Sequence, residues 1–458
     1  MSTNSFMMDP RDLESNTVCL PPGTLLDPLA LAMLQPAVGG FLFYGSKMKV
    51  ASSGVAATFN FPDGIADSRA VSSATRWLPS IAKRGASSVR GTGPLLLGAL
   101  PFDRNESACL FVPEITYSED RSGNAWITLV DGPNAVDHLP TDPDKLLAAL
   151  AERLTGVDEG GSHLADYQVN DGKTFTNEIV KLFSIPDEQE FLEAIRSALG
   201  SIADGVIDKV VLARRIEATL RREIDPAGVV RRLSALEPSS TVFAVMGPDG
   251  AFVGASPELL IAREGAVVSS HPLAGTVPLT GEPDADDKAV ARLAASSKEQ
   301  AEHQSVVDAV GTHLGSWCTE MQIPSSPAVL RLRTVAHLGT LLTGRLNLKQ
   351  GADPTEGPTA LRLASELHPT PAVAGTPRNP ALEAIGLLEH SSRGLYAGPV
   401  GWVDASGDGE FVIGIRSAEL KGRIANVHAG VGIVAGSDPE QELAETTAKL
   451  RTAVSALT

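Results

Sequence analysis

Two short polar turns between apolar segments constrain the fold of this 458-residue chain more than any other feature. The turn "GPDG" (247–250) separates "TVFAVM" from "AFVGAS", and "SGDG" (406–409) separates "LYAGPVGWVDA" from "EFVIGIRSAEL". Short turns rich in Gly and Asp connect neighbouring antiparallel strands. Because hairpins replace strictly alternating strand–helix units, the pattern predicts an α/β (α+β) fold with large antiparallel or mixed β-sheets flanked by helices.

Further apolar runs predict additional strands. Residues 208–220 form one, and residues 266–276 are expected to add a third strand to the antiparallel set of the first hairpin. Buried strands are expected at 91–103 and 108–118, and a loop at 156–173. The absence of an internal repeat excludes solenoid folds.

Helices are predicted where apolar residues recur at helical spacing. In the segment 184–205, apolar residues follow that spacing and acidic residues fill the first turn. The last helix is expected to begin in "SDPE" (437–440), where Ser437 and Glu440 have capping-box spacing and Pro439 suits a first helical position.

Composition narrows the class of protein. Apolar residues make up 43% of the chain, which suffices for a sizeable core. A net charge of −17 repels nucleic acid and anionic membranes, so neither is an expected partner. The start lacks the pattern of a signal peptide, and Asp27, Pro28 and Pro36 interrupt the most apolar early stretch, which argues against a membrane span. Three scattered cysteines match neither a disulfide framework nor a zinc cluster, and favour a cytoplasmic location.

Two pairs of glutamates are the first candidates for chemistry. Glu299 and Glu302 lie three positions apart in one predicted helix, and Glu442 and Glu445 repeat the arrangement in the last one. Residues at this spacing share a helix face. Each pair alone is compatible with a solvated face. If the pairs meet, four carboxylates suit Mg²⁺, which prefers oxygen ligands and needs only one or two from the protein.

Lys209 and Glu258 each allow two interpretations. Lys209 either marks the end of an apolar strand or acts as a general base whose pKa is lowered by burial or nearby cations. Glu258 follows Pro257 and is either a carboxylate in the first turn of a helix or a protonated general acid. Local sequence leaves both questions open.

Three further features point to anion binding. Arg416 is expected in an otherwise apolar strand, where a buried guanidinium needs a partner such as a bound carboxylate. The glycine-rich segment 428–439 would let backbone N–H groups approach a ligand before the last helix. His337, on its own, is compatible with a hydrogen-bonded structural role.

The chain resembles the chorismate-utilising enzymes, clearly from about residue 190 to the end and weakly back through "GALPFD". The segments that carry the resemblance are "DKVVLARR", "GASPELL", "PLAGT", "KEQAEH", "AHLGT", "ELHPTPAVAGTP", "RGLYAGPVGW", "IRSAEL", "AGVGI" and "GSDPEQELAETTAKL". The resemblance implies one chorismate-utilising-enzyme fold in a single domain. Residues 86–458 are expected to form the chorismate-binding catalytic domain, and residues 1–85 a variable N-terminal region of the same fold.

The resemblance also implies residue roles. Glu302 and Glu445 would bind Mg²⁺ directly, and Glu299 and Glu442 would hold metal-bound waters. Lys209 would activate the nucleophile, and Glu258 would protonate the leaving hydroxyl. The residues expected to bind substrate are Gly275, Thr276, His337, Ala372, Tyr396, Arg416, Gly430 and Gly432, with Lys449 in support.

Three positions indicate a branch of the family. Ammonia-using members carry Gln where this chain has Lys209, and a covalent branch carries Lys where it has Ala274. Salicylate synthases typically carry Thr where it has Ala372. The chain therefore most resembles isochorismate synthases, which feed siderophore (2,3-dihydroxybenzoate) or menaquinone synthesis. Val431 and Leu395 depart from the usual pattern and affect the expected pocket shape.

The expected partner is the small-molecule substrate chorismate. No glutamine amidotransferase subunit is expected, because water and not ammonia would be the nucleophile, and the protein is expected to be a monomer. The alternatives are a salicylate synthase, which shares nearly all these residues, and a catalytically silent chorismate-binding protein.

Overall fold

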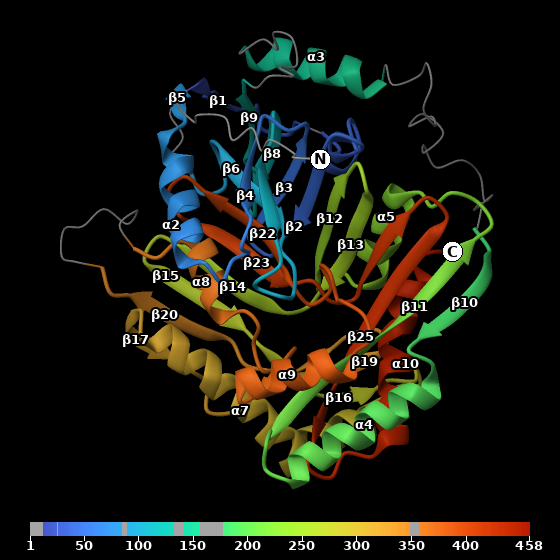
Figure 1. Cartoon of the computed structure of the whole chain (residues 1–458). Coiled ribbons are helices and arrows are strands. Elements are labelled where there is room, and N and C mark those ends of the chain that lie inside the picture. Colours follow the sequence, from blue (N-terminus) through green and yellow to red (C-terminus); the bar gives the residue numbers. More distant parts are fainter. Residues whose placement is uncertain (1–11, 25, 85–88, 132–141, 156–176, 349–356) are drawn as a thin grey trace.

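Two large β-sheets form the centre of the molecule, and helices cover their outer faces (Figure 1). The computed structural model describes residues 12–24, 26–84, 89–131, 142–155, 177–348 and 357–458. No helix in this described part of the chain combines the length and the apolar run needed to cross a bilayer.

The larger sheet has thirteen strands. Its order is β10 (Ile179–Ile185), β11 (Lys209–Leu220), β25 (Ile424–Val434), β24 (Ser417–Lys421), β13 (Gly250–Ser256), β12 (Thr241–Gly247), β2 (Gly40–Tyr44), β3 (Met48–Ser53), β8 (Ile115–Asp120), β9 (Ala125–Val130), β1 (Glu14–Cys19) and β5 (Ala82–Arg84), with β21 (Gly375–Thr376) also paired to β11. Neighbours are antiparallel except β1 and β5, which are parallel.

The second sheet has nine strands, and a third has three. The nine-stranded order is β17 (Cys318–Gln322), β20 (Leu342–Leu346), β15 (Val267–His271), β14 (Leu259–Glu264), β23 (Gly409–Ile413), β22 (Pro399–Asp404), β6 (Leu95–Ala99), β7 (Ala108–Val112) and β4 (Ala57–Phe61). The small sheet is β16 (Leu273–Pro278), β19 (Val335–Gly339) and β18 (Ala328–Arg331).

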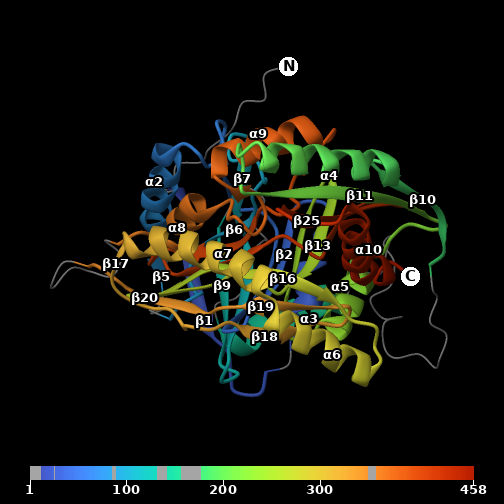
Figure 2. The ribbon, with the colours of Figure 1, turned by 90° about the horizontal axis from the view of Figure 1, so that it is seen from below.

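The three largest apolar cores of the described residues hold these layers together. One lies between the two large sheets, where Phe243 and Trp402 are fully buried. A second lies under α1 (Pro28–Ala32), α3 (Pro143–Thr155), α5 (Pro226–Leu236) and α10 (Pro439–Ser455). The third gathers α2 (Ser68–Trp77), α4 (Glu188–Ala203), α7 (Ser297–Gly315), α8 (Ala360–Leu367) and α9 (Arg378–Leu388), while the 3₁₀ turn η2 (Leu78–Ser80) and α6 (Pro283–Ala295) complete the helices (Figure 2).

The structure confirms both predicted hairpins and the best-defined helix. β12 pairs with β13 and β22 with β23, each across its polar turn. Asp187 and Glu190 form a capping box at the start of α4. α10 begins at Pro439, the expected first helical position, but Asp438 and not Ser437 caps it, by accepting the Gln441 N–H.

Two predicted strands are wrong in the same way. The run 108–118 is divided between β7 and β8, which lie in different sheets, and the run 266–276 is divided between β15 and β16. Neither β15 nor β16 joins the sheet of β12 and β13. Pro113 and Pro272 occupy the breaks. Proline cannot donate a ladder hydrogen bond, so the chain leaves one sheet there and enters another.

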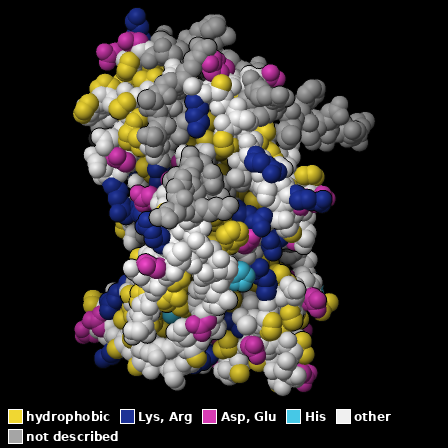
Figure 3. All heavy atoms as spheres, turned by 90° about the vertical axis from the view of Figure 1, so that its left-hand side faces the viewer, with side chains coloured by type: hydrophobic (Ala, Val, Ile, Leu, Met, Phe, Trp, Pro, Cys, Tyr) yellow, Lys and Arg dark blue, Asp and Glu magenta, His cyan; other side chains and the backbone are white. Residues whose placement is uncertain are grey.

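The N-terminal region supplies strands to both large sheets: β1, β2, β3 and β5 to one and β4 to the other. The loop expected at 156–173 lies outside the described residues. On the face that Figure 3 shows, basic and acidic side chains of the described residues are interspersed.

Candidate active site

All of the predicted site residues line one cavity of about 90 Å³ where the three sheets meet α7 and α10. They come from sequence positions as far apart as 209 and 449. The positions are Lys209 at the start of β11; Gly430 and Gly432 in β25; Gly275 and Thr276 in β16; His337 in β19; Glu299 and Glu302 in α7; Glu442, Glu445 and Lys449 in α10; and Glu258, Ala372, Tyr396 and Arg416 between elements.

Two lysine–glutamate ion pairs line the cavity, one between β11 and α7 and the other within α10. Lys209 Nζ is 2.7 Å from Glu302 Oε1, and Lys209 is only 3% exposed. Lys449 Nζ is 2.6 Å from Glu445 Oε1 and also donates to the Gly430 carbonyl. Burial would raise the pKa of Glu302, but the charge of Lys209 lowers it below its usual value. Both pairs therefore place charged groups inside the cavity.

The other two glutamates, Glu299 and Glu442, have carboxyl groups whose pKa values are raised. Burial and then the charge of Glu302 raise the pKa of Glu299, which accepts the Thr276 N–H at 3.1 Å. Burial and then the charge of Glu445 raise the pKa of Glu442 to about 7. A cation placed among these carboxylates would relieve their repulsion.

This set of oxygen donors fits Mg²⁺. As the side chains stand, no three His, Cys, Asp or Glu groups of the described residues enclose a metal ion. Mg²⁺ commonly takes one or two protein carboxylates and fills its remaining positions with water and substrate oxygens. Glu302 and Glu445 are the residues that would hold it.

Glu258 lies in the short connection between β13 and β14, which excludes the first of its two interpretations, a carboxylate in the first turn of a helix. It is 3% exposed, and its N–H donates to Ser256 Oγ at 3.3 Å. Burial raises the pKa of its carboxyl to about 8, against the opposing charge of Lys209. Glu258 is therefore mostly protonated at neutral pH and able to donate a proton.

Arg416 is also placed differently from the prediction. It lies between β23 and β24, where the chain crosses from the nine-stranded to the thirteen-stranded sheet, and its φ is 53°. The crossing, and not strand pairing, directs its side chain into the cavity. Ala397, on another side of the cavity, also has a positive φ of 62°. Such conformations cost energy in non-glycine residues and cluster at functional sites.

His337 connects Arg416 to Thr276. Its Nε2 lies 3.0 Å from Arg416 Nη2 and its Nδ1 lies 3.0 Å from Thr276 Oγ1. Burial and the Arg416 charge hold the pKa of His337 well below its usual value, so the ring is neutral. Because a guanidinium only donates, Nε2 must accept and Nδ1 must carry the hydrogen. Thr276 Oγ1 then accepts from His337, and its own hydrogen can point to a ligand.

Close approach explains the two glycines of β25. A Cβ on Gly432 would lie 2.8 Å from Glu302 Oε1, and one on Gly430 would lie 3.2 Å from the Tyr396 hydroxyl. The Tyr396 ring stacks on His428, with centroids 5.0 Å apart, and burial raises the pKa of its hydroxyl to about 12. Tyr396 is thus a fixed neutral hydrogen-bond donor.

Two charged residues that line the cavity were not predicted. Lys298 lies 3.9 Å from Glu442, and Arg393 is buried against the backbone of Val373 and Val211. Both belong to the motif segments "KEQAEH" and "RGLYAG". Their charge and their position inside these motifs could therefore have identified Lys298 and Arg393 as site residues.

Comparisons with known proteins agree with this geometry. A profile of the family described as "Chorismate binding enzyme" matches residues 23–458. Isochorismate synthase DhbC of Bacillus subtilis is 35% identical over 80% of this chain and 81% of its own length. Putative isochorismate synthase MenF of Mycobacterium tuberculosis is 39% identical over 80% and 87%. The crystal structure of a putative 2,3-dihydroxybenzoate-specific isochorismate synthase from Bacillus anthracis has a TM-score of 0.73 and 29% identity, covering 92% of this chain and 96% of that one.

Proposed function

This chain belongs to the family of chorismate-binding enzymes, and we propose that it isomerises chorismate to isochorismate. Water attacks C2 of the ring, both ring double bonds shift, and the C4 hydroxyl leaves as water. The atoms balance without an oxidant or a second substrate. The names of the relatives support a place in 2,3-dihydroxybenzoate or menaquinone synthesis.

One observation carries the proposal: a buried, protonated acid and a lysine line the same cavity. Glu258, with its raised pKa, supplies the proton that the departing C4 hydroxyl needs. Lys209 takes a proton from the attacking water. Its ion pair with Glu302 corresponds to the protonated lysine that exists after this transfer.

The remaining residues hold the substrate. Arg416 and the Thr276 hydroxyl donate to the substrate carboxylates, with His337 keeping both donors in position. Tyr396 and the backbone of Gly430 and Gly432 complete the binding surface. Fixed donors lower the entropic cost of orienting the ring.

Mg²⁺ is the cofactor in this proposal, held by Glu302 and Glu445, with Glu299 and Glu442 beside them. When bound, it would offset the charge of the ring carboxylate. The four carboxylates support a divalent cation, since their charges otherwise oppose one another.

Product analysis tests the proposal. With Mg²⁺ in ¹⁸O-labelled water, chorismate should give isochorismate labelled at its C2 hydroxyl, and Lys209→Ala should abolish turnover while the circular dichroism spectrum stays unchanged. Excess ammonium should give no aminated product. An aminated product would assign the chain to an ammonia-using branch, and turnover by the Lys209 variant would remove it as the base.

Two alternatives give different products. A salicylate synthase would release pyruvate, and Ala372 in the cavity argues for little pyruvate at neutral pH. A silent chorismate-binding protein would bind without turnover. Retention of Lys209, Glu258 and the four glutamates in one cavity argues against it.

A further inference from the structure

One edge of β11 lacks a neighbouring strand over a short stretch. Along this edge, β21 pairs with Lys209 and Val210, and β10 pairs with the strand from Arg215 onward. Among the described residues, no strand pairs with 211–214 on this side, whereas β25 pairs with β11 on the other side without a break (Figure 1). The residues of the gap are buried, so their backbone groups need other hydrogen-bond partners.

An ion pair takes the place of the missing strand. Arg393 Nη2 donates to the Val211 carbonyl at 2.7 Å, and Glu389 Oε1 accepts the Ala213 N–H at 2.7 Å. A neighbouring antiparallel strand would supply the same two contacts, one donor and one acceptor. Arg393 also donates to the Glu389 carboxylate through Nε and Nη2. The two side chains are 3% and 8% exposed, so water competes little for these contacts.

The same arginine reaches two more segments of the active-site wall. Its Nη1 donates to the carbonyl of Val373, the residue after Ala372, at 2.8 Å. Its own carbonyl accepts the Tyr396 N–H at 3.0 Å and so closes the turn that carries the Tyr396 ring. Val211, Val373, Ala372 and Tyr396 all line the active-site cavity. Arg393 therefore connects three separate segments of one wall.

Glu389 keeps this connection charged and in one geometry. Burial alone would lower the pKa of the Arg393 guanidinium, but the charge of Glu389 raises it above its usual value. The Arg393 Cζ lies 4.2 Å from the centre of the Phe102 ring. A buried ion pair adds little net stability, because both groups lose their hydration. It does fix directions, since a planar guanidinium donates along set lines.

We propose that Arg393 and Glu389 are positioning residues for the reaction on chorismate. They hold β11, which begins with Lys209, and the wall that includes Ala372 in the geometry that turnover requires. Each guanidinium nitrogen of Arg393 already donates to a protein acceptor, so the pair acts through other residues and not on the substrate. This inference rests on the proposed function.

Arg393→Lys tests the proposal, because a lysine keeps the charge but cannot reproduce the planar set of donors. We expect kcat to fall about 10²-fold, as for a displacement of a reacting group by about 1 Å. KM should change less than kcat, because Arg416 and Thr276, the donors to the substrate carboxylates, are held by His337 and not by this pair. Circular dichroism and the unfolding midpoint give the folded fraction, and kcat is compared per folded molecule.

Arg362→Lys is the matched control. Arg362 pairs with Glu366 at the same i,i+4 spacing in α8, and neither residue lines the active-site cavity. Its kcat and KM should equal those of the wild type.

Glu389→Gln is the second variant, for the case that Arg393→Lys does not fold. The amide oxygen can still accept the Ala213 N–H, but the charge that holds Arg393 is lost. We expect kcat to fall by less than in Arg393→Lys, again with a smaller change in KM.

Each contrary result has a distinct meaning. Wild-type kcat in folded Arg393→Lys, or in Glu389→Gln if the first variant does not fold, would refute the positioning role. Failure of both variants to fold would assign the pair to stability alone and would also refute it, as would an equal loss of turnover in Arg362→Lys. All of these leave the proposed isomerase activity untouched, whereas a wild type that forms no isochorismate from chorismate would refute the proposed function itself.

Discussion

At the scale of single residues, strain and burial are concentrated around one cavity. Among the described residues, the non-glycine positions with positive φ are Ala397 and Arg416, and both line it. Glu258 and His337 are held there in their neutral forms. Such perturbations oppose stability and persist where the surrounding structure compensates for them.

Glu258→Gln should keep chorismate binding but lose turnover by about 10²- to 10⁴-fold, because only the proton donor is removed. The raised pKa of about 8 also sets a pH dependence. The acid form exists below that pKa, so wild-type turnover should fall as pH rises through about 8. Chorismate binding by calorimetry and a kcat/KM profile from pH 6 to about 9 measure both effects. Near-normal turnover in the variant would exclude Glu258 as the acid.

Gly432→Ala should disrupt the Lys209–Glu302 ion pair. The added Cβ would lie 2.8 Å from Glu302 Oε1 and 2.9 Å from Lys209 Cε, so one of them must move. Displacement by about 1 Å can cost about 10²-fold in rate. Gly247→Ala, whose Cβ meets nothing within 4 Å, is the control. Steady-state kinetics that are equal for both variants would contradict the assigned geometry.

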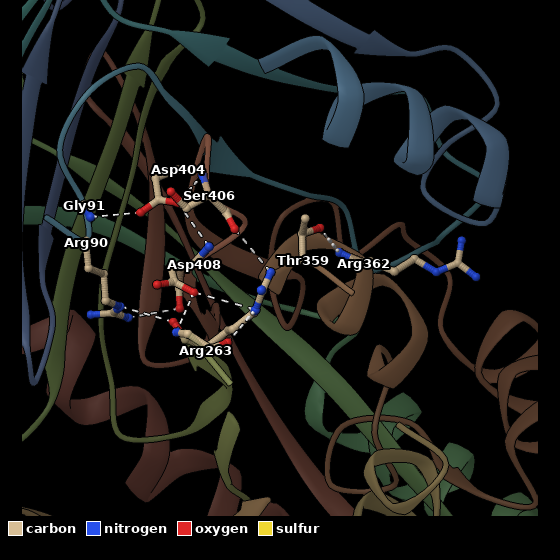
Figure 4. A network of polar contacts seen from close by, with 10 residues as sticks. Arg90, Gly91, Arg263, Thr359, Arg362, Asp404, Ser406 and Asp408 are labelled. Atoms are coloured by element: carbon tan, nitrogen blue, oxygen red, sulfur yellow. Dashed lines mark hydrogen bonds and ion pairs between the residues drawn. The ribbon is translucent and has the colours of Figure 1, made fainter. Parts of the chain in front are cut away.

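At the scale of elements, a buried polar network fixes the turn between β22 and β23 (Figure 4). The Asp404 carboxylate accepts the N–H groups of Gly91, Ser406 and Asp408. Arg263, which is fully buried in β14, lies 3.6 Å from Asp408 and reaches the Ser406 carbonyl. The network joins the turn between β22 and β23 to β14, the strand that follows Glu258.

Arg263→Met should lower the free energy of unfolding by about 3 kcal/mol at pH 7, because it removes the cation that lies 3.6 Å from Asp408 and leaves only the charge of Arg90 to offset the buried carboxylates. Burial already raises the pKa of Asp404 to about 6. The carboxylates therefore become protonated in the variant as pH falls through that range, and the loss of stability should shrink at pH 5. The midpoint of thermal unfolding measures both.

Arg69→Met, which breaks an exposed ion pair, should change that midpoint little. If Arg263→Met unfolds at the wild-type midpoint, or if its deficit grows at low pH, the network does not act as described.

At the scale of the whole molecule, ligand binding and chain topology determine stability. Mg²⁺ should raise the unfolding midpoint, since a ligand at 100 times its dissociation constant adds about 2.7 kcal/mol. The double variant Glu302→Gln and Glu445→Gln should lose this shift as well as turnover. Full turnover of the wild type in excess chelator would exclude a metal requirement.

We infer that residues 1–85 and 86–458 fold as one unit. β2 and β3 lie between β12 and β8 in the larger sheet, so a chain that begins at residue 86 would expose two inner strand edges. We expect that chain to be insoluble or unfolded by circular dichroism. A soluble, cooperatively folded product would show two independent units. Light scattering on the full chain tests the expected monomer.

Local patterns were sufficient for features that depend on neighbouring residues. The hairpin at 247–250, the strand from Lys209 and the helix capped by Asp187 follow from turn chemistry, apolar runs and capping, which act over a few positions. The same spacing rules place Glu299 and Glu302 on one helix face. Family motifs then indicated that distant segments share a site.

Tertiary structure decided the features that depend on distant residues. Pro113 and Pro272 became crossings between sheets because separate sheets were available on either side. Arg416 acquired its positive φ at such a crossing. The pKa of Glu258 rises because β-strands and loops far away in the sequence exclude water from it. Burial is a property of the assembled chain, which short-range patterns do not contain.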